Sequence, residues 1–227
     1  MKLIRRDSYL QKMFKAVGTP DVKVITGVRR SGKSKLLELF KKEVKKAYKS
    51  ANIIHINFNL PQFDKLSSYQ ALYDYVDVKY IPHVINFLLI DEIQMCDGFE
   101  KVINWLHAQE KYDIYITGSN AFLLSSDLAT LFTGRTFQIK MFPFSFAEYL
   151  QYFPDKDKYS ALEQYLHDGG MSGSYTYEEE EMRYDYLSSV FDTLIVRDIK
   201  QKYNIRNLQL MNKLISFLMD NIGNLSS

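Results

Sequence analysis

The feature that most constrains this sequence is a short β-branched run that leads directly into a loop with two glycines, a lysine and a serine. The run Val22–Thr26 is followed by Gly27–Ser34 (GVRRSGKS), which fits the pattern G-x-x-x-x-G-K-[ST]. From Ser34 to Ala47, apolar residues recur at helical spacing while lysines occupy the other face, which predicts an amphipathic helix. A strand, a glycine-rich loop and a helix in this order predict a phosphate-binding loop at the amino terminus of the helix.

Four positions of this loop have a chemical role in the prediction, and Arg29 and Arg30 are left open between contact with phosphate and contact with the C-terminal helices. Gly27 and Gly32 allow the backbone to fold tightly, so that its N–H groups can surround a phosphate. Lys33 supplies positive charge to the β- and γ-phosphates, and Ser34 offers its hydroxyl to Mg²⁺. A glycine-rich turn without a ligand is the alternative, but the flanking strand and helix favour phosphate binding. The predicted phosphate-binding residues are Gly27, Val28, Arg29, Arg30, Ser31, Gly32, Lys33, Ser34 and Lys35.

A continuous apolar run that ends in two carboxylates supplies the second part of the predicted site. The run Asn86–Glu92 (NFLLIDE) is typical of a central strand buried on both faces, and ligands of open α/β sheets lie at the carboxyl ends of such strands. We expect Asp91 to hold Mg²⁺ through its water shell and Glu92 to polarise the water that attacks the γ-phosphate. The alternative is that both residues cap the next helix. A glutamate beside the metal aspartate favours hydrolysis over phosphoryl transfer to a small molecule, which brings its own nucleophile.

Three further polar residues are candidates for the same site. A strand is predicted at 113–119, and a position between the loop strand and the acidic strand would bring Ser119 or Asn120 near the γ-phosphate. Either side chain could then orient the attacking water, although Asn120 could instead cap a helix. Arg135 is interpreted either as part of the nucleotide site of a neighbouring subunit or as a member of a surface or inter-domain ion pair.

The order of strand and helix patterns predicts an α/β fold, with a mainly parallel five-stranded sheet flanked by helices. Strands are predicted at 22–26, 51–59, 86–92, 113–119 and 136–142, and helices at 1–20, 34–47, 69–75, 99–110 and 121–131. From Ala147 onward the pattern is helical only. We therefore expect an ATPase-type domain at 1–150 and a smaller helical lid domain at 151–227.

Composition narrows the class of protein without naming a partner. With 46% hydrophobic and 25% charged residues in 227, the chain is globular and not a low-complexity scaffold. The formal net charge of +2 is too small to demand a nucleic acid. A single cysteine, Cys96, excludes an internal disulfide and a multi-cysteine metal site. The sequence shows neither a secretory signal nor an apolar run long enough to span a membrane, so a cytoplasmic location is expected.

Taken together, the motifs resemble a group of prokaryotic AAA+-type ATPases found in archaea and bacteria. The resemblance rests on GVRRSGKS (27–34), FLLIDEIQ (87–94), YITGSNAFLLSSDLATLFTGR (115–135) and FPFSFAEYL (142–150). It continues into the helical part with Gly169–Met171, although Ser172 stands where the group usually has proline. The runs 196–199 (VRDI) and 221–223 (NIG) match two later motifs, the second of which opens a winged-helix-like segment.

The resemblance implies ATP rather than GTP as the ligand. With Mg²⁺ at the motif residues, the leading hypothesis is hydrolysis of ATP to ADP as a conformational switch, and a homo-oligomer follows if Arg135 reaches a neighbouring subunit. It also implies that the lid is cut off at the start of the winged-helix-like segment, and that a region beyond it selects a nucleic-acid or protein client. Two alternatives stay open from the sequence: a nucleotide-gated nucleic-acid-binding module and a P-loop small-molecule kinase.

Overall fold

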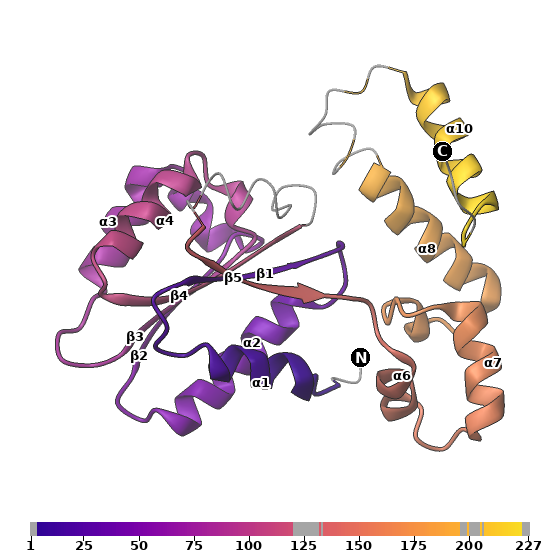
Figure 1. Cartoon of the computed structure of the whole chain (residues 1–227), viewed down its shortest axis with the longest axis horizontal. Helices are drawn as coiled ribbons and strands as arrows, with labels where there is room; N and C mark the ends of the chain where they lie inside the picture. Colours follow the sequence, from indigo (N-terminus) through magenta and orange to yellow (C-terminus); the bar gives the residue numbers. More distant parts are fainter. Residues whose placement is uncertain are drawn as a thin grey trace.

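The computed structural model describes residues 4–119, 132, 134–195, 199, 205 and 207–223. In this part of the chain, five parallel strands form one sheet in the order β2-β3-β4-β1-β5 (Figure 1). The strands are β1 (Val22–Gly27), β2 (Asn52–Asn57), β3 (Asn86–Asp91), β4 (Tyr112–Ser119) and β5 (Thr136–Met141). The predicted α/β fold with a parallel five-stranded sheet is therefore confirmed. In this order β4 lies between the loop strand β1 and the acidic strand β3, the position on which the candidates Ser119 and Asn120 depended.

Helices cover both faces of the sheet. On one face lie α1 (Asp7–Lys15) and α2 (Lys33–Ala47), and on the other lie α3 (Tyr69–Val78) and α4 (Phe99–Ala108) (Figure 1). Two short 3₁₀ segments, Pro61–Leu66 and Ile93–Met95, were not predicted from the sequence. The helix predicted at 121–131 lies outside the described residues.

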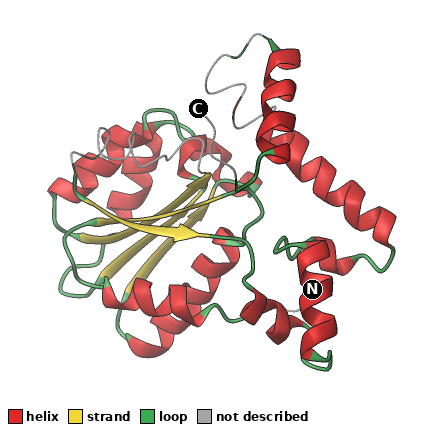
Figure 2. Cartoon of the chain, turned by 45° about the vertical axis from the view of Figure 1, so that its right-hand side comes forward, coloured by secondary structure: helices red, strands yellow, loops and turns green. Residues whose placement is uncertain are grey.

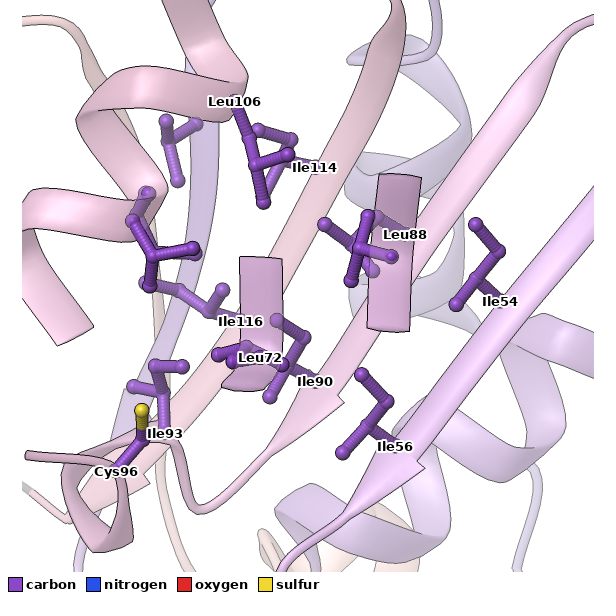
Figure 3. Close-up of a cluster of buried hydrophobic side chains, with 14 of the residues drawn as sticks. Ile54, Ile56, Leu72, Leu88, Ile90, Ile93, Cys96, Leu106, Ile114 and Ile116 are labelled. Carbon is purple, nitrogen blue, oxygen red and sulfur yellow. The ribbon is translucent and has the colours of Figure 1, made fainter. Parts of the chain in front are cut away.

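Burial on both faces explains why the strands have continuous apolar runs. All six residues of β3 are buried. Leu88 and Ile90 join the cluster beneath α3 and α4, which Figure 3 shows together with Ile54, Ile56 and Ile116. The alternate residues of β3, such as Leu89, face α1 and α2 and pack in the second cluster. Side chains alternate between faces along a strand, so this assignment also fixes the face on which each polar strand residue lies.

After β5 the described chain is helical, as the sequence predicted. Its helices are α6 (Phe146–Tyr152), α7 (Lys158–Asp168), α8 (Glu180–Thr193) and α10 (Leu208–Asp220), with a 3₁₀ turn at Ser174–Thr176. They stand beside the sheet domain (Figure 2). Aromatic rings hold the first part of this helical region together: Tyr149 lies 4.8 Å from Phe153, 5.4 Å from Tyr165 and 5.2 Å from Tyr175 between ring centroids. Every helix among the described residues is too short or too polar to span a bilayer.

A buried arginine near the amino terminus connects the sheet domain with the helical region. Arg6 is 5% exposed, and its guanidinium donates to both carboxylate oxygens of Glu148 on α6, at 2.6 and 2.8 Å. It also donates to the carbonyl oxygens of Ser31, at 3.0 Å, and Phe142, at 2.9 Å. One side chain therefore links α1, the loop after β1, the segment after β5 and the start of α6.

Candidate functional site

The predicted phosphate loop joins the carboxyl end of β1 to α2, as the sequence pattern indicates. Gly32 precedes the helix with φ +98°, a conformation that favours glycine. At Gly27 a Cβ atom would lie 2.3 Å from the carbonyl oxygen of Met141, so only glycine fits against β5. The first amides of α2 have no partner within the helix, and together with the helix dipole they favour an anion at this point.

The lysine of the loop is folded onto the loop backbone. Lys33 is 4% exposed, and its ammonium donates to the carbonyl oxygens of Gly27 at 2.9 Å and Val28 at 3.1 Å. Its charge is therefore held at the loop itself. The next lysine, Lys35, is exposed and pairs with Glu38 at 2.9 Å.

The two carboxylates lie where β3 ends. Asp91 is 1% exposed, and its Oδ1 accepts a hydrogen bond from the hydroxyl of Thr117 on β4. Glu92 has φ +57°, and its backbone N–H donates to the same hydroxyl at 3.1 Å. The side-chain amide of Gln94 donates to Glu92 Oε2. A short network thus fixes both acidic residues.

Two buried side-chain oxygens in this region test whether the residues present fit a nucleotide and its metal. Asp91 Oδ2 and Ser31 Oγ are buried without a hydrogen-bond partner in the described part of the chain. Buried polar atoms of this kind normally have a partner. The Ser31 hydroxyl can donate to a phosphate or a water, and Asp91 Oδ2, an acceptor, can accept from a water or bind a hydrated cation. Within the described residues there is no group of three or more His, Cys, Asp and Glu side chains suited to a metal. A cation here would therefore depend mainly on phosphate and water ligands, as Mg²⁺ usually does.

A cavity of about 400 Å³ lies between the loop and the helical region. Its sheet-domain wall is formed by Arg30, Gly32, Lys33, Ser34, Lys35 and Glu92, and its opposite wall by Ser172, Gly173, Thr176, Tyr177 and Tyr186. The two walls also touch each other directly, because the guanidinium of Arg30 lies 4.9 Å from the ring centroid of Tyr186. A second cavity of about 460 Å³ lies at the amino-terminal ends of strands β1, β3 and β4, and no residue of the phosphate loop lines it.

Of the predicted site residues, those that line this cavity are Arg30, Gly32, Lys33, Ser34, Lys35 and Glu92. Glu92 lines the same cavity as Lys33 and Ser34, and Ser119 is the register partner of Gly27 at the end of β4. Nothing is described for Asn120, which lies outside the described residues. Placement thus supports a shared site for the loop and Glu92 and leaves the role of Ser119 and Asn120 as a prediction.

Arg135 lies at the amino-terminal end of the strands, opposite the end at which the phosphate loop lies. It is exposed, and its carbonyl oxygen accepts a hydrogen bond from Val22 N–H at 3.0 Å, so it sits where β1 and β5 begin. The phosphate loop follows the opposite end of β1, about 20 Å away at the usual rise per residue. Arg135 therefore does not join the cavity of its own chain, which leaves the two predicted alternatives, a neighbouring subunit or a surface contact.

Several residues of the site were not assigned a role from the sequence. The C-terminal wall, including Tyr177 and Tyr186, comes from a segment whose aromatics follow no motif spacing. Thr117 and Gln94 were noted only as motif positions. One signal could have singled out Thr117: it is a polar residue within a buried strand beside the acidic strand, and buried polar groups normally have a hydrogen-bond partner.

Cys96 lies two residues after Gln94 and is no candidate nucleophile. It is 1% exposed, and burial raises the pKa of its thiol to about 12. The nearby carboxylates of Asp97 and Glu100 act in the same direction. The thiolate is therefore scarce near neutral pH.

A parallel α/β sheet whose β1 strand runs into a phosphate loop and an amphipathic helix defines the P-loop NTPase class of fold. A sequence profile described as an AAA domain matches residues 19–150, more than half of the chain. The chain therefore belongs to the AAA domain family. A second profile, described as a domain of unknown function, matches residues 159–227.

Two curated relatives come from distant organisms. An uncharacterized protein of Haemophilus influenzae is 36% identical over 231 residues, in an alignment that covers 98% of this chain and 57% of the relative. An uncharacterized protein of Methanocaldococcus jannaschii is 28% identical over 215 residues, covering 89% of this chain and 47% of the relative. The chain thus spans about half the length of the curated relatives that it matches.

Solved structures support the fold alone. The Saccharomyces cerevisiae Hsp104–ADP complex has a TM-score of 0.53 at 13% identity, covering 74% of this chain and 26% of that chain. The Hsp104–casein complex of the same yeast, in its extended conformation, has a TM-score of 0.50 at 12% identity, covering 87% and 39%. Such low identities carry no information on substrate.

Proposed function

We propose that this chain is a Mg²⁺-dependent ATPase of the AAA+ type, and that binding and hydrolysis of ATP switch the helical region relative to the sheet domain. The single observation that carries the proposal is the 400 Å³ cavity in which Lys33 and Ser34 at the start of α2 and Glu92 after β3 meet residues of the helical region. Phosphate-binding groups, an acidic residue and a second wall are the three parts that such a switch requires.

In this proposal the loop binds the triphosphate. The amides at the start of α2 surround the β-phosphate, and Lys33 leaves the carbonyl oxygens of Gly27 and Val28 to pair with phosphate oxygens. The exchange is favourable because a carbonyl oxygen is neutral overall, whereas the oxygens of a phosphate share a formal negative charge and accept stronger hydrogen bonds from an ammonium. Ser34 is placed on the first turn of the helix, where its hydroxyl can serve as a metal ligand.

The acidic residues would perform the hydrolytic step. Ser34 and the unpartnered Oδ2 of Asp91 would hold Mg²⁺ together with phosphate and water, and the bound ion would neutralise charge that develops on the phosphates. Glu92 would accept a hydrogen bond from the attacking water and orient it toward the γ-phosphate. Gln94, which donates to Glu92 Oε2, leaves the other carboxylate oxygen for that water.

Coupling to the helical region follows from two contacts of the loop. Arg30 packs on Tyr186 of α8, and the carbonyl of Ser31 accepts from Arg6, which also holds Glu148 on α6. A change in the loop on nucleotide binding would therefore alter the contacts of the loop with α8 and, through Arg6, with α6. We propose residues 1–150 and 151–227 as the two moving domains, with α6 (Phe146–Tyr152) crossing the boundary between them.

We further propose that the chain belongs to the prokaryotic AAA+-type group whose motifs it resembles. In this proposal Arg135, which is exposed and lies away from the cavity of its own chain, reaches the nucleotide of a neighbouring copy in a homo-oligomer. Since the curated relatives are about twice as long, selection of a nucleic-acid or protein client would belong to regions that this chain does not include.

Phosphate release from ATP tests the proposal. Lys33→Ala should abolish nucleotide binding and turnover together, because it removes the charge that faces the phosphates. Glu92→Gln should retain binding and lose turnover by about 100-fold or more. The matched controls are Lys42→Ala, an exposed lysine of the same helix, and Glu163→Gln, an exposed glutamate of α7.

Turnover by both site variants at the wild-type rate would refute the assignment. A small-molecule kinase makes a different prediction from an ATPase. It would release ADP only with an acceptor present, and it would tolerate Glu92→Gln, so the same variants assayed with and without a metabolite extract separate the two functions.

A further inference from the structure

One buried hydroxyl touches both acidic residues of the site. Thr117 is 0% exposed on β4, the strand between the acidic strand β3 and the loop strand β1. It is the register neighbour of Ile25 on β1. Residues two apart on a strand point to the same face of the sheet. Tyr115, two residues before Thr117, packs in the cluster beneath α1 and α2, so the side chain of Thr117 lies on that face as well.

The hydroxyl of Thr117 forms two hydrogen bonds. It donates to Asp91 Oδ1 and accepts from the backbone N–H of Glu92, at 3.1 Å for the second bond. A hydroxyl can donate one hydrogen bond and accept others at once. Valine, which has the same shape, can do neither, so the residue type at this buried position matters chemically.

Both bonds restrain features on which the proposed chemistry depends. The bond to Asp91 engages Oδ1 and leaves Oδ2 as the acceptor without a partner among the described residues. The bond to Glu92 holds a backbone with φ +57° and ψ +50°, which a residue with a Cβ rarely adopts. That turn directs the chain so that Glu92 lines the cavity beside Lys33.

We propose that Thr117 is a positioning residue for ATP hydrolysis, acting through Asp91 and Glu92 rather than on the nucleotide. It holds the Asp91 carboxylate with one oxygen available for the water shell of Mg²⁺, and it fixes the turn that presents Glu92 to the attacking water. The inference rests on the proposed ATPase function and adds a residue to its machinery.

The test compares Thr117→Val with Thr117→Ser. Valine keeps the shape and removes both hydrogen bonds, and we expect kcat to fall by about 10- to 100-fold, as for other residues that orient metal and catalytic ligands. We expect KM for ATP measured at saturating Mg²⁺ to change little, because the loop is intact. Serine restores the hydroxyl and should restore most of kcat.

A second readout does not depend on turnover. The affinity for a non-hydrolysable ATP analogue is measured with Mg²⁺ and with EDTA, and Thr117→Val should reduce the gain in affinity that Mg²⁺ gives while leaving the EDTA value unchanged. Thr26→Val is the matched control. Thr26 is also a buried threonine, 2% exposed on the neighbouring strand β1, but its hydroxyl accepts from Gln138 and not from the acidic residues.

The outcomes separate this inference from the proposed function. If the wild-type chain does not hydrolyse ATP, the proposed function fails. If the wild-type chain hydrolyses ATP and Thr117→Val does so at the same rate with the same Mg²⁺ response, only the role of Thr117 is overturned. Equal losses in Thr117→Val and Thr26→Val, or a Thr117→Ser variant as impaired as the valine variant, would assign the effect to packing and also overturn it.

Discussion

The ion pair between Arg6 and Glu148 predicts a large and specific loss of stability when one partner loses its charge. Arg6 is 5% exposed and the Glu148 side chain 12%, with N–O distances of 2.6 and 2.8 Å. Glu148→Gln keeps the size of the side chain but leaves the buried guanidinium without its counter-charge. We expect the free energy of unfolding to fall by about 3 kcal/mol.

The size of this expected loss depends on the contacts that Arg6 retains in the Glu148→Gln variant. Breaking a buried pair costs about 3–5 kcal/mol when the remaining charge has no other partner. Here the guanidinium still donates to the carbonyl oxygens of Ser31 and Phe142 and lies 4.6 Å from the ring centroid of Tyr9, so the lower end of that range applies. For a chain of this length, the corresponding fall in Tm is about 6–12 °C.

Urea unfolding followed by circular dichroism measures the effect, with a double-mutant cycle as the control. Arg6→Met alone leaves the Glu148 carboxylate buried, but combining it with Glu148→Gln removes both uncompensated charges. The double variant should therefore be more stable than the sum of the single effects predicts, by about 2 kcal/mol. A single-variant loss below about 1 kcal/mol, or strict additivity, would show that the pair behaves like a surface contact and would refute the reasoning.

Three smaller predictions concern other parts of the chain. Gly173→Ala would place a Cβ 1.9 Å from the Tyr186 hydroxyl oxygen, so a Tm lowered by several degrees is expected, and less so when Tyr186 is also shortened to serine. Burial, followed by the charge of Lys41, lowers the pKa of His55 in the folded state. The unfolded chain therefore binds the proton more readily, and the stability that neutral His55 contributes above about pH 6.5 is lost as the pH falls further. His55→Gln should remove that part of the slope in unfolding free energy between about pH 7 and 5; an unchanged slope would contradict it. Cys96, with its raised pKa and burial, should resist iodoacetamide at pH 8 and react once urea unfolds the chain, whereas equal rates in both states would argue against its burial.

The sequence predicts well those parts of the molecule that depend on neighbours along the chain. The phosphate loop Gly27–Ser34 is directly preceded by its strand and followed by its helix in the sequence. The run that ends at Asp91 is continuously apolar, and this composition alone predicts that the strand is buried. Each of these needs only local periodicity and the chemistry of glycine. The sequence predicts that the sheet is parallel, but the order β2-β3-β4-β1-β5 is known only once the strands are assembled.

The remainder depends on contacts between distant segments. Arg6 and Glu148 are 142 residues apart, and nothing in the spacing of either residue indicates the other. The same holds for Tyr186, which meets Arg30 only because the helical region lies against the loop. The two hydrogen bonds of Thr117 depend on the register of β4 against β3, which is set only once the sheet is assembled.

Analysis of the nucleotide that remains bound after incubation with Mg²⁺-ATP and rapid desalting tests the central claim most directly. Wild-type protein should retain ADP, Glu92→Gln should retain ATP, and Lys33→Ala should retain neither. This pattern requires that the loop binds the triphosphate and that Glu92 is needed only for hydrolysis. Intact ATP on the wild-type protein, or ADP on Glu92→Gln in the wild-type amount, would contradict the account.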